Sequence, residues 1–202
     1  MTGSGLVDYT SQEHDGAATA EIADQLIDVW ARHNTTQDPV YRKEATLKYT
    51  ECDRFRCFTA SYDGRIAGFA YGMYNSQGVD LNGPGQTSSS GALDLVEERI
   101  PPLHPHWRAA FDISEVQVLE DCRGYRIATR LVLSLCASIP GEDPVVLCVE
   151  PDNDTGAEHV YQQVGFKRLF PLPFAAKYLP ADEKVLMGIR RANNAADRRR
   201  AA

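Results

Sequence analysis

The spacing of apolar residues along the chain predicts a protein of mixed helices and strands. Some stretches carry apolar side chains at helical spacing, and shorter runs that alternate or stay apolar are typical of strands. The predicted helices are Ala17–His33, Val40–Tyr49, Arg126–Ala137 and a helix from Ala157 that stops at Gly165. The predicted strands are Leu6–Tyr9, Phe55–Tyr62, Arg65–Tyr74, Ile113–Leu119, Val145–Glu150, a strand from Phe166 to about Phe170, and Lys184–Arg190. Asp63-Gly64 between two of these strands is a strong signal for a two-residue hairpin turn.

One predicted strand leads through a short basic turn into the third of these helices. Arg123, Arg126 and Arg130 gather positive charge there, in a chain whose formal net charge is −7. Backbone N–H groups at such a turn point toward one place, and the helix dipole adds positive potential, so the turn suits a phosphate or pyrophosphate. An ordinary strand-to-helix turn with surface arginines is the alternative on these residues alone.

This turn resembles the acyl-CoA pyrophosphate loop of the GNAT N-acetyltransferase superfamily. The family motif is Arg/Gln-x-x-Gly-x-Gly/Ala after a strand that ends in Val, and it stands here as Arg123-Gly124-Tyr125-Arg126-Ile127-Ala128. Arg126 therefore takes the place of the first motif glycine. A second block is similar to the family's pattern of Asn, a small residue and Tyr-x-x-x-Gly-Phe, and it consists of Asn153, Ala157, Tyr161, Gly165 and Phe166. Two matching blocks at the expected separation indicate GNAT membership.

The resemblance implies the GNAT fold, which is of the α/β (α+β) class. That fold has a central mixed, mostly antiparallel sheet of about seven strands flanked by about four helices. We expect one acetyltransferase domain over residues 1–190 and a disordered basic tail over residues 191–202. Residues 75–110 are expected to form an inserted loop or lid, because long insertions in compact domains are often binding loops. A decorated surface loop or a dimer contact is an equal alternative for this insertion.

Acyl transfer from a thioester to an amine needs a neutral amine, a stabilised oxyanion and a proton for the leaving thiolate. The resemblance assigns Glu115 as the general base, directly or through water, and Tyr161 as the general acid near the CoA sulfur. Backbone amides near Val118 would hold the oxyanion. Strand alternation puts Glu115 and Gln117 on one face, and Val116 and Val118 on the other. The alternatives are an exposed strand carboxylate for Glu115 and a half-buried packing tyrosine for Tyr161.

The resemblance also implies acetyl-CoA as the co-substrate, with no metal. The residues expected to bind it are Gln117, Val118, Arg123, Gly124, Tyr125, Arg126, Ile127, Ala128, Thr129 and Asn153. Asn153 is expected to hydrogen-bond the cofactor, to cap the next helix, or both. Trp107 and Glu98 in the insertion are expected to contact the acceptor. His104 and His106 lack further ligands in register, which makes them a weak metal signal.

Composition indicates the class of protein, its cellular compartment and the charge of its partners. A length of 202 residues and an apolar fraction of 43% suit a single soluble globular domain. No apolar run approaches the roughly 20 residues that span a bilayer, and the N-terminus lacks the features of a secretory signal. The five cysteines show no C-x-x-C spacing, which favours reduced thiols in a cytoplasm over a zinc site. The acidic net charge disfavours nucleic acid as a partner and tolerates a cationic acceptor.

We therefore expect a cytoplasmic N-acetyltransferase that moves an acetyl group from acetyl-CoA to a primary amine of a small cationic acceptor. The amine is expected to attack directly in a ternary complex. A protein or peptide N-acetyltransferase is the alternative within the enzyme class, and a non-catalytic acyl-CoA sensor is the alternative outside it. The expected partners are acetyl-CoA and a small-molecule amine, without nucleic acid or membrane, and a homodimer is the candidate assembly.

Overall fold

The computed structural model describes residues 9–35, 38–52, 54–74, 110–140, 143, 145–149, 156–172 and 184–189. The chain divides into two compact units, one of Met1–Gly72 with Glu115–Leu135 and one of Met73–Ser114 with Cys136–Ala202. The single domain predicted over residues 1–190 stays a prediction.

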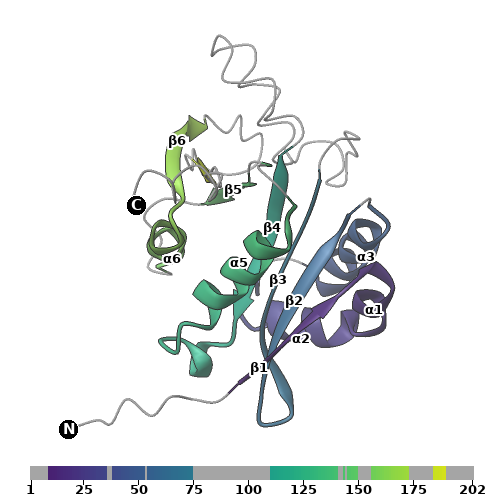
Figure 1. The fold of residues 1–202 in the computed structure, drawn as a ribbon. Coiled ribbons are helices and arrows are strands. Elements are labelled where there is room, and N and C mark those ends of the chain that lie inside the picture. The colour runs from purple at the N-terminus through teal and green to yellow at the C-terminus, as the bar shows by residue number, and fades with distance from the viewer. Residues whose placement is uncertain are drawn as a thin grey trace, which may run out of the picture. The chain divides into compact units, whose positions relative to one another are not determined.

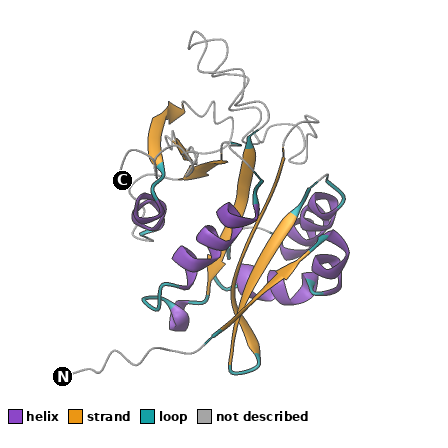
Figure 2. Cartoon of the chain, in the orientation of Figure 1, coloured by secondary structure: helices purple, strands orange, loops and turns teal. Residues whose placement is uncertain are grey.

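Helices and strands alternate along the described residues (Figure 2). In chain order the elements are β1 (Thr10–His14), α1 (Gly16–Glu21), α2 (Ala23–Ala31), α3 (Pro39–Thr50), β2 (Arg56–Tyr62), β3 (Arg65–Tyr74), β4 (Phe111–Val118), a 3-10 helix (Glu120–Cys122), α5 (Ile127–Ser138), β5 (Val145–Val149), α6 (Ala157–Val164), β6 (Lys167–Leu172) and β7 (Lys184–Ile189). β3, β4 and α5 contribute residues to both units. None of the described helices is long and apolar enough to cross a membrane.

The first unit places its strands in the order β1-β2-β3-β4. β1 pairs antiparallel with β2, and β2 pairs antiparallel with β3. Figure 1 shows α1, α2 and α3 gathered on one side of these strands and α5 on the other. The largest side chains with at most 2% exposure in this core are Leu26, Trp30, Phe69, Tyr71, Ile127, Leu131 and Leu135. Burial of such side chains stabilises the unit by about 25 cal/mol for each Å² of apolar surface removed from water.

The hairpin of β2 and β3 is the element that the sequence predicts best. Asp63 and Gly64 have φ angles of 50° and 73°, which is the left-handed pair that a type I′ turn requires. The turn joins Tyr62 and Arg65, which are paired at the end of the ladder. The predicted hairpin is confirmed, with β2 beginning one residue later than expected.

The predicted helix over Ala17–His33 is wrong in its continuity. The structure divides it at Ile22 into α1 and α2, because Ile22 has the non-helical angles φ −102° and ψ 8°. The N–H of Ile22 donates to the carbonyl of Thr19 at 3.2 Å, a tight three-residue step that ends α1. The spacing of apolar residues does not reveal this break, because one tightened turn hardly changes the side of the helix on which the following apolar residues lie.

The first strand also differs from its prediction. β1 runs over the polar stretch Thr10–His14, of which only His14 is buried. Tyr9 precedes the strand, and the remainder of the predicted strand Leu6–Tyr9 lies outside the described residues. β1 is an edge strand, and polar side chains are tolerated there because its exposed positions face solvent.

The second unit places its strands in the order β4-β5-β7-β6. β5 is parallel to β4 and antiparallel to β7, and β6 pairs antiparallel with β7. α6 ends at Gly165, whose φ of 105° is the left-handed cap predicted from the sequence. The N–H of the next residue, Phe166, donates to the carbonyl of Tyr161 at 3.0 Å and closes that cap. The predicted class, α/β with a mixed and mostly antiparallel sheet, is confirmed.

Candidate active site

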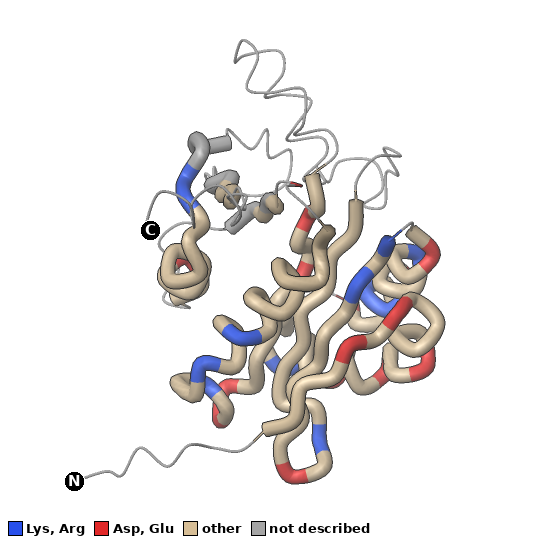
Figure 3. Tube along the Cα trace, viewed as in Figure 1, with Lys and Arg blue, Asp and Glu red and all other residues tan. Residues whose placement is uncertain are grey.

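The turn between β4 and α5 has the backbone geometry of an anion-binding turn. Gly124 and Arg126 have positive φ angles of 84° and 61°. The N–H of Arg130 donates to the carbonyl of Arg126 at 3.1 Å, so the helical bonding of α5 starts at this turn. Left-handed residues beside right-handed ones make neighbouring N–H groups converge, and the start of a helix adds positive potential. Figure 3 shows basic segments gathered at the same turn.

Arg126 replaces the glycine of the motif but keeps the backbone conformation that favours glycine. Its φ of 61° lies in the left-handed region, which costs a residue with a Cβ about 1–2 kcal/mol. Arg126 therefore occupies a left-handed position that a glycine would adopt without this cost. The side chain of Arg126 is exposed, so its charge is presented at the surface of the turn.

The other predicted side chains of the turn divide into buried and exposed ones. Ile127 is 2% exposed and belongs to the core, so only its backbone remains for a ligand. Tyr125 is 46% exposed, whereas Ala128 and Thr129 are half-buried. Arg123 is exposed, and its Nη2 donates to Nδ1 of His33 at 3.2 Å. That contact joins the turn to the segment that follows α2, and no sequence pattern predicts it.

The two faces of β4 carry different chemistry, as strand alternation predicts. Nε2 of Gln117 donates to Oε1 of Glu115 at 2.8 Å, so these two side chains share one face. A Cβ at Gly68 of β3 would lie 3.0 Å from Cγ2 of Val118 and 3.3 Å from Cγ2 of Ile127 at the start of α5. Val118 therefore faces α5, and Glu115 lies on the opposite face.

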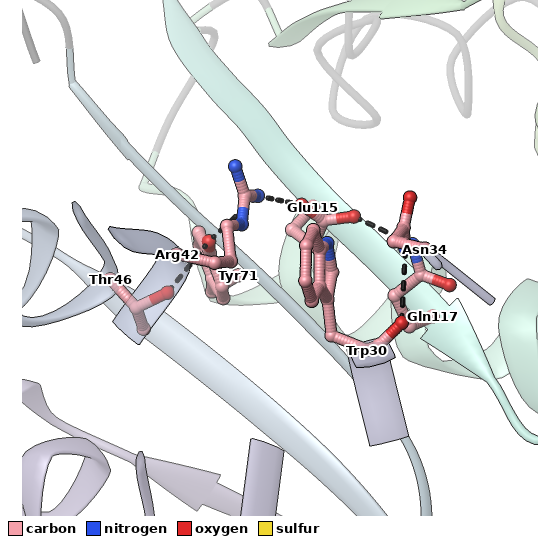
Figure 4. Close-up of polar contacts among 7 residues, drawn as sticks. All are labelled: Trp30, Asn34, Arg42, Thr46, Tyr71, Glu115 and Gln117. Carbon is pink, nitrogen blue, oxygen red and sulfur yellow. Dashed lines mark hydrogen bonds and ion pairs between the residues drawn. The ribbon is translucent and has the colours of Figure 1, made fainter. Parts of the chain in front are cut away.

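Glu115 is the centre of a polar cluster formed with Arg42, Tyr71 and Gln117, and we call it the Glu115 cluster (Figure 4). Arg42 of α3 forms an ion pair with Oε2 of Glu115, and the two side chains are 18% and 13% exposed. Nη2 of Arg42 also donates to the hydroxyl of Tyr71 at 3.2 Å. Both carboxylate oxygens of Glu115 are thus engaged, one by Arg42 and one by Gln117.

Buried side chains hold Arg42 in this position. Its guanidinium carbon lies 5.6 Å from the centroid of the Trp30 ring, within the range of a cation–π contact. The hydroxyls of Thr46 and Tyr71 are 3.4 Å apart, which fixes the hydroxyl that Arg42 contacts. Trp30 is 2% exposed, and Thr46 and Tyr71 are each 1% exposed. Sequence reasoning missed Arg42, Trp30 and Tyr71, because the contacts that single them out join α2, α3 and β3.

Tyr161 lies on α6 of the second unit. Burial raises the pKa of Tyr161 to about 12, so its phenol stays protonated near neutral pH. Its ring meets that of Phe166 edge-on, with the ring centroids 6.0 Å apart. The neutral phenol carries the proton that a donor needs, although the raised pKa makes it a weaker acid than a phenol in water.

Several predicted residues lie outside the described part of the chain. These are Asn153, Trp107 and Glu98, together with the insertion up to residue 109 and the tail 191–202. Their predicted roles stay predictions. Among the described residues, no group of three or more His, Cys, Asp or Glu side chains could hold a metal ion.

Comparison with known proteins decides the family. The sequence model of the Acetyltransferase (GNAT) family matches residues 23–166, which include the basic turn and both candidate catalytic residues. The chain belongs to the GNAT family of acetyltransferases. No curated protein sequence matches the chain.

Solved structures share the GNAT fold with this chain at low sequence identity. A GNAT-family acetyltransferase from Streptococcus pneumoniae has a TM-score of 0.59 and 14% identity, covering 91% of this chain and 100% of its own. An aminoglycoside N-acetyltransferase in complex with CoA has a TM-score of 0.56 and 15% identity, covering 85% and 96%. NAA60 from Arabidopsis thaliana, in complex with a bisubstrate analogue, has a TM-score of 0.58 and 13% identity, covering 91% and 98%.

As a GNAT protein, the chain is an acyl-CoA-dependent N-acyltransferase that uses acetyl-CoA. The turn that opens α5 suits the phosphates of that co-substrate, since three arginines and converging N–H groups lie there. The face of β4 opposite to Val118 carries the Glu115 cluster, in which the cation Arg42 and the anion Glu115 are both mostly buried.

Proposed function

We propose that this GNAT protein transfers the acetyl group of acetyl-CoA to the primary amine of a small molecule. The observation that carries the proposal is the arrangement of β4. One face of this strand carries a mostly buried carboxylate, Glu115, and the strand is followed by a 3-10 helix and then by the basic turn of Gly124 and Arg126, which suits a phosphate. A donor site and an acceptor site on one rigid strand can hold two substrates at once, so the amine attacks in a ternary complex.

The amine nitrogen attacks the thioester carbonyl carbon, and the new C–N bond forms as the carbonyl oxygen becomes an oxyanion. Backbone N–H groups near Val118 stabilise that oxyanion. The C–S bond then breaks, and Tyr161 gives its proton to the departing CoA thiolate. The proton lost by the amine goes to Glu115, directly or through a water molecule. The products are an N-acetylated acceptor and free CoA thiol.

The sequence predicts a small cationic acceptor from the net charge and from acidic residues of the insertion, Asp94, Glu97 and Glu98, and this part stays a prediction. A peptide or protein acceptor is the alternative. A cytoplasmic location and a homodimer also stay predictions from the sequence.

Steady-state kinetics test the direct attack. Initial rates at varied concentrations of acetyl-CoA and acceptor should give intersecting double-reciprocal lines. Parallel lines would point instead to an acetyl-enzyme intermediate.

Substitution of Tyr161 tests the acid. Tyr161→Phe should lower kcat by about 100-fold and leave the Kd of acetyl-CoA nearly unchanged, because the ring remains while the proton donor is lost. Tyr62→Phe is the matched control, since Tyr62 is a 39% exposed tyrosine at the end of β2. An unchanged kcat in the Tyr161 variant would remove this residue from the mechanism.

Substitution of Glu115 tests the base. Glu115→Gln should flatten the dependence of kcat/KM on pH, because the group that receives the proton of the amine is lost. A profile identical to that of the wild type would leave the amine to lose its proton to bulk water.

A further inference from the structure

Arg42 brings a positive charge to the face of β4 where the amine is proposed to react. Its guanidinium is 18% exposed and forms an ion pair with Glu115, which is 13% exposed. A partly buried ion pair gains little net stability, because the loss of hydration offsets most of the attraction. A contribution to the stability of the fold therefore does not by itself explain why this ion pair lies at the proposed reaction site.

Part of the hydrogen-bonding capacity of the Arg42 guanidinium is not used within the Glu115 cluster. Arginine has five N–H donors in a planar fork that matches a carboxylate. Nη2 is the atom that contacts Tyr71 and Glu115. Within the described residues, Nη1 and Nε of Arg42 have no hydrogen-bond partner, and each two-donor edge of the fork pairs one of them with Nη2, which Glu115 now holds, so a carboxylate that displaces Glu115 can bind two donors. The guanidinium carbon lies 5.6 Å from the centroid of the Trp30 ring, and this contact helps to hold the guanidinium in place before a ligand binds.

Arg42 and Glu115 place a positive and a negative group side by side. Such a site favours a ligand that carries a negative group for Arg42 and a positive group for Glu115. We propose that the acceptor is an α-amino acid, whose carboxylate binds Arg42 while its amine faces Glu115. This inference rests on the proposed acetyl transfer and names a zwitterion as acceptor in place of the small cation expected from the net charge. In the free enzyme, Glu115 occupies the place on Arg42 that the carboxylate of the acceptor takes over. Binding of the acceptor therefore releases Glu115 from Arg42 at the moment when a base is needed.

Charge distinguishes this acceptor from a polyamine or an aminoglycoside. Those molecules carry several cations and no carboxylate, so a second positive group would lie beside Arg42, and like charges in a partly buried site repel strongly. An α-amino acid zwitterion instead places one negative group on Arg42 and one positive group on Glu115. The sum of charges in the site stays at zero, which limits the cost of desolvation.

The experiment measures kcat/KM for three matched acceptors: an α-amino acid, its primary amide, and the amine that lacks the carboxylate. A panel of amino acids with different side chains is screened first. The wild-type enzyme should prefer the best amino acid over its amide by at least about tenfold, because a charged, bidentate hydrogen-bond pair is lost in the amide. Arg42→Gln should reduce that preference to about twofold or less, through KM for the amino acid.

Two further variants keep the test decisive. Lys43→Gln removes the neighbouring charge on α3, which pairs with Asp24 at the surface, and should leave the preference unchanged. Arg42→Lys keeps the charge without the fork, and should leave a preference between those of the wild type and Arg42→Gln. Acetyl-CoA affinity, measured by calorimetry on each variant, shows that the fold and the donor site persist.

The outcomes separate this inference from the proposed function. If amides and plain amines are acetylated as well as amino acids, and Arg42→Gln slows all of them by the same factor, the α-amino acid proposal is overturned while acetyl transfer stands. If acetyl-CoA binds and no amine of any class is acetylated, both proposals are overturned, and a sensing role is favoured.

Discussion

Replacement of Arg126 by glycine should stabilise this protein, although it removes a residue of the proposed cofactor turn. Arg126 has a φ of 61°, which glycine adopts without steric cost. In any other L-residue this conformation brings Cβ close to the following carbonyl oxygen. Arg126→Gly relieves that contact, whereas Arg126→Ala removes the same charge and retains the contact.

The size of the effect follows from two opposing contributions. Relief of the left-handed conformation is worth about 1–2 kcal/mol, and the greater freedom of glycine in the unfolded chain takes back about 0.5–1 kcal/mol. The net gain in the free energy of unfolding is about 0.5–1 kcal/mol. For a chain of 202 residues this raises Tm by about 1–4 °C. The alanine variant should not be more stable than the wild type.

Thermal and denaturant unfolding of the two variants would measure this difference, and calorimetry would measure their affinity for acetyl-CoA. Both variants lose the guanidinium, so the Kd of acetyl-CoA should rise by the same factor in both. The backbone and side-chain contributions of Arg126 are thereby separated. A glycine variant no more stable than the alanine variant would refute the reasoning, because the strain would then not lie at this φ.

Three further substitutions test other parts of the account. Arg123→Ala should weaken acetyl-CoA binding by about tenfold through loss of a charged phosphate contact; Arg56→Ala, which removes a half-exposed arginine on β2, should leave the Kd unchanged in the same calorimetric titration. Gly68→Ala should lower the free energy of unfolding by about 1–3 kcal/mol in urea titrations, since its Cβ would lie 2.8 Å from the carbonyl oxygen of Gln117; unchanged stability would contradict this close approach. Burial raises the pKa of Cys57 to about 12 from 9.0, so above pH 9 the unfolded chain loses this proton first and stability falls as pH rises toward 12. Cys57→Ala should make the loss of Tm between pH 9 and 11 shallower, and an identical slope would show that this thiol does not contribute.

The local elements were predictable wherever one short signal decides them. Asp63-Gly64 fixes its hairpin through the left-handed turn, and Gly165 ends α6 for the same conformational reason. The helix predicted over Val40–Tyr49 is α3, and Asp38 caps its start by accepting a hydrogen bond from the N–H of Val40 at 2.9 Å. These features depend on residues close together in the sequence, so no knowledge of the packing is needed.

The features that escaped prediction depend on packing between distant segments. The break at Ile22 lies inside a continuous apolar pattern, and β1 is an edge strand of mostly exposed residues. The ion pair of Arg42 and Glu115 joins positions far apart along the chain, and single-sequence patterns carry no signal for such a contact. The motif predicted the turn at Arg126, but only the backbone shows that arginine keeps the conformation of glycine.

The most direct test of the central claim measures CoA thiol release from acetyl-CoA together with the mass of the acceptor. The acceptors should include amino acids, small amines, polyamines, aminoglycosides and short peptides. We predict that thiol release equals the amount of acceptor that gains one acetyl group on its amine, and that both signals are strongly reduced in Tyr161→Phe. Acetyl-CoA binding without thiol release for any acceptor would contradict it, and thiol release without an acetylated amine would show that the acetyl group goes to water instead.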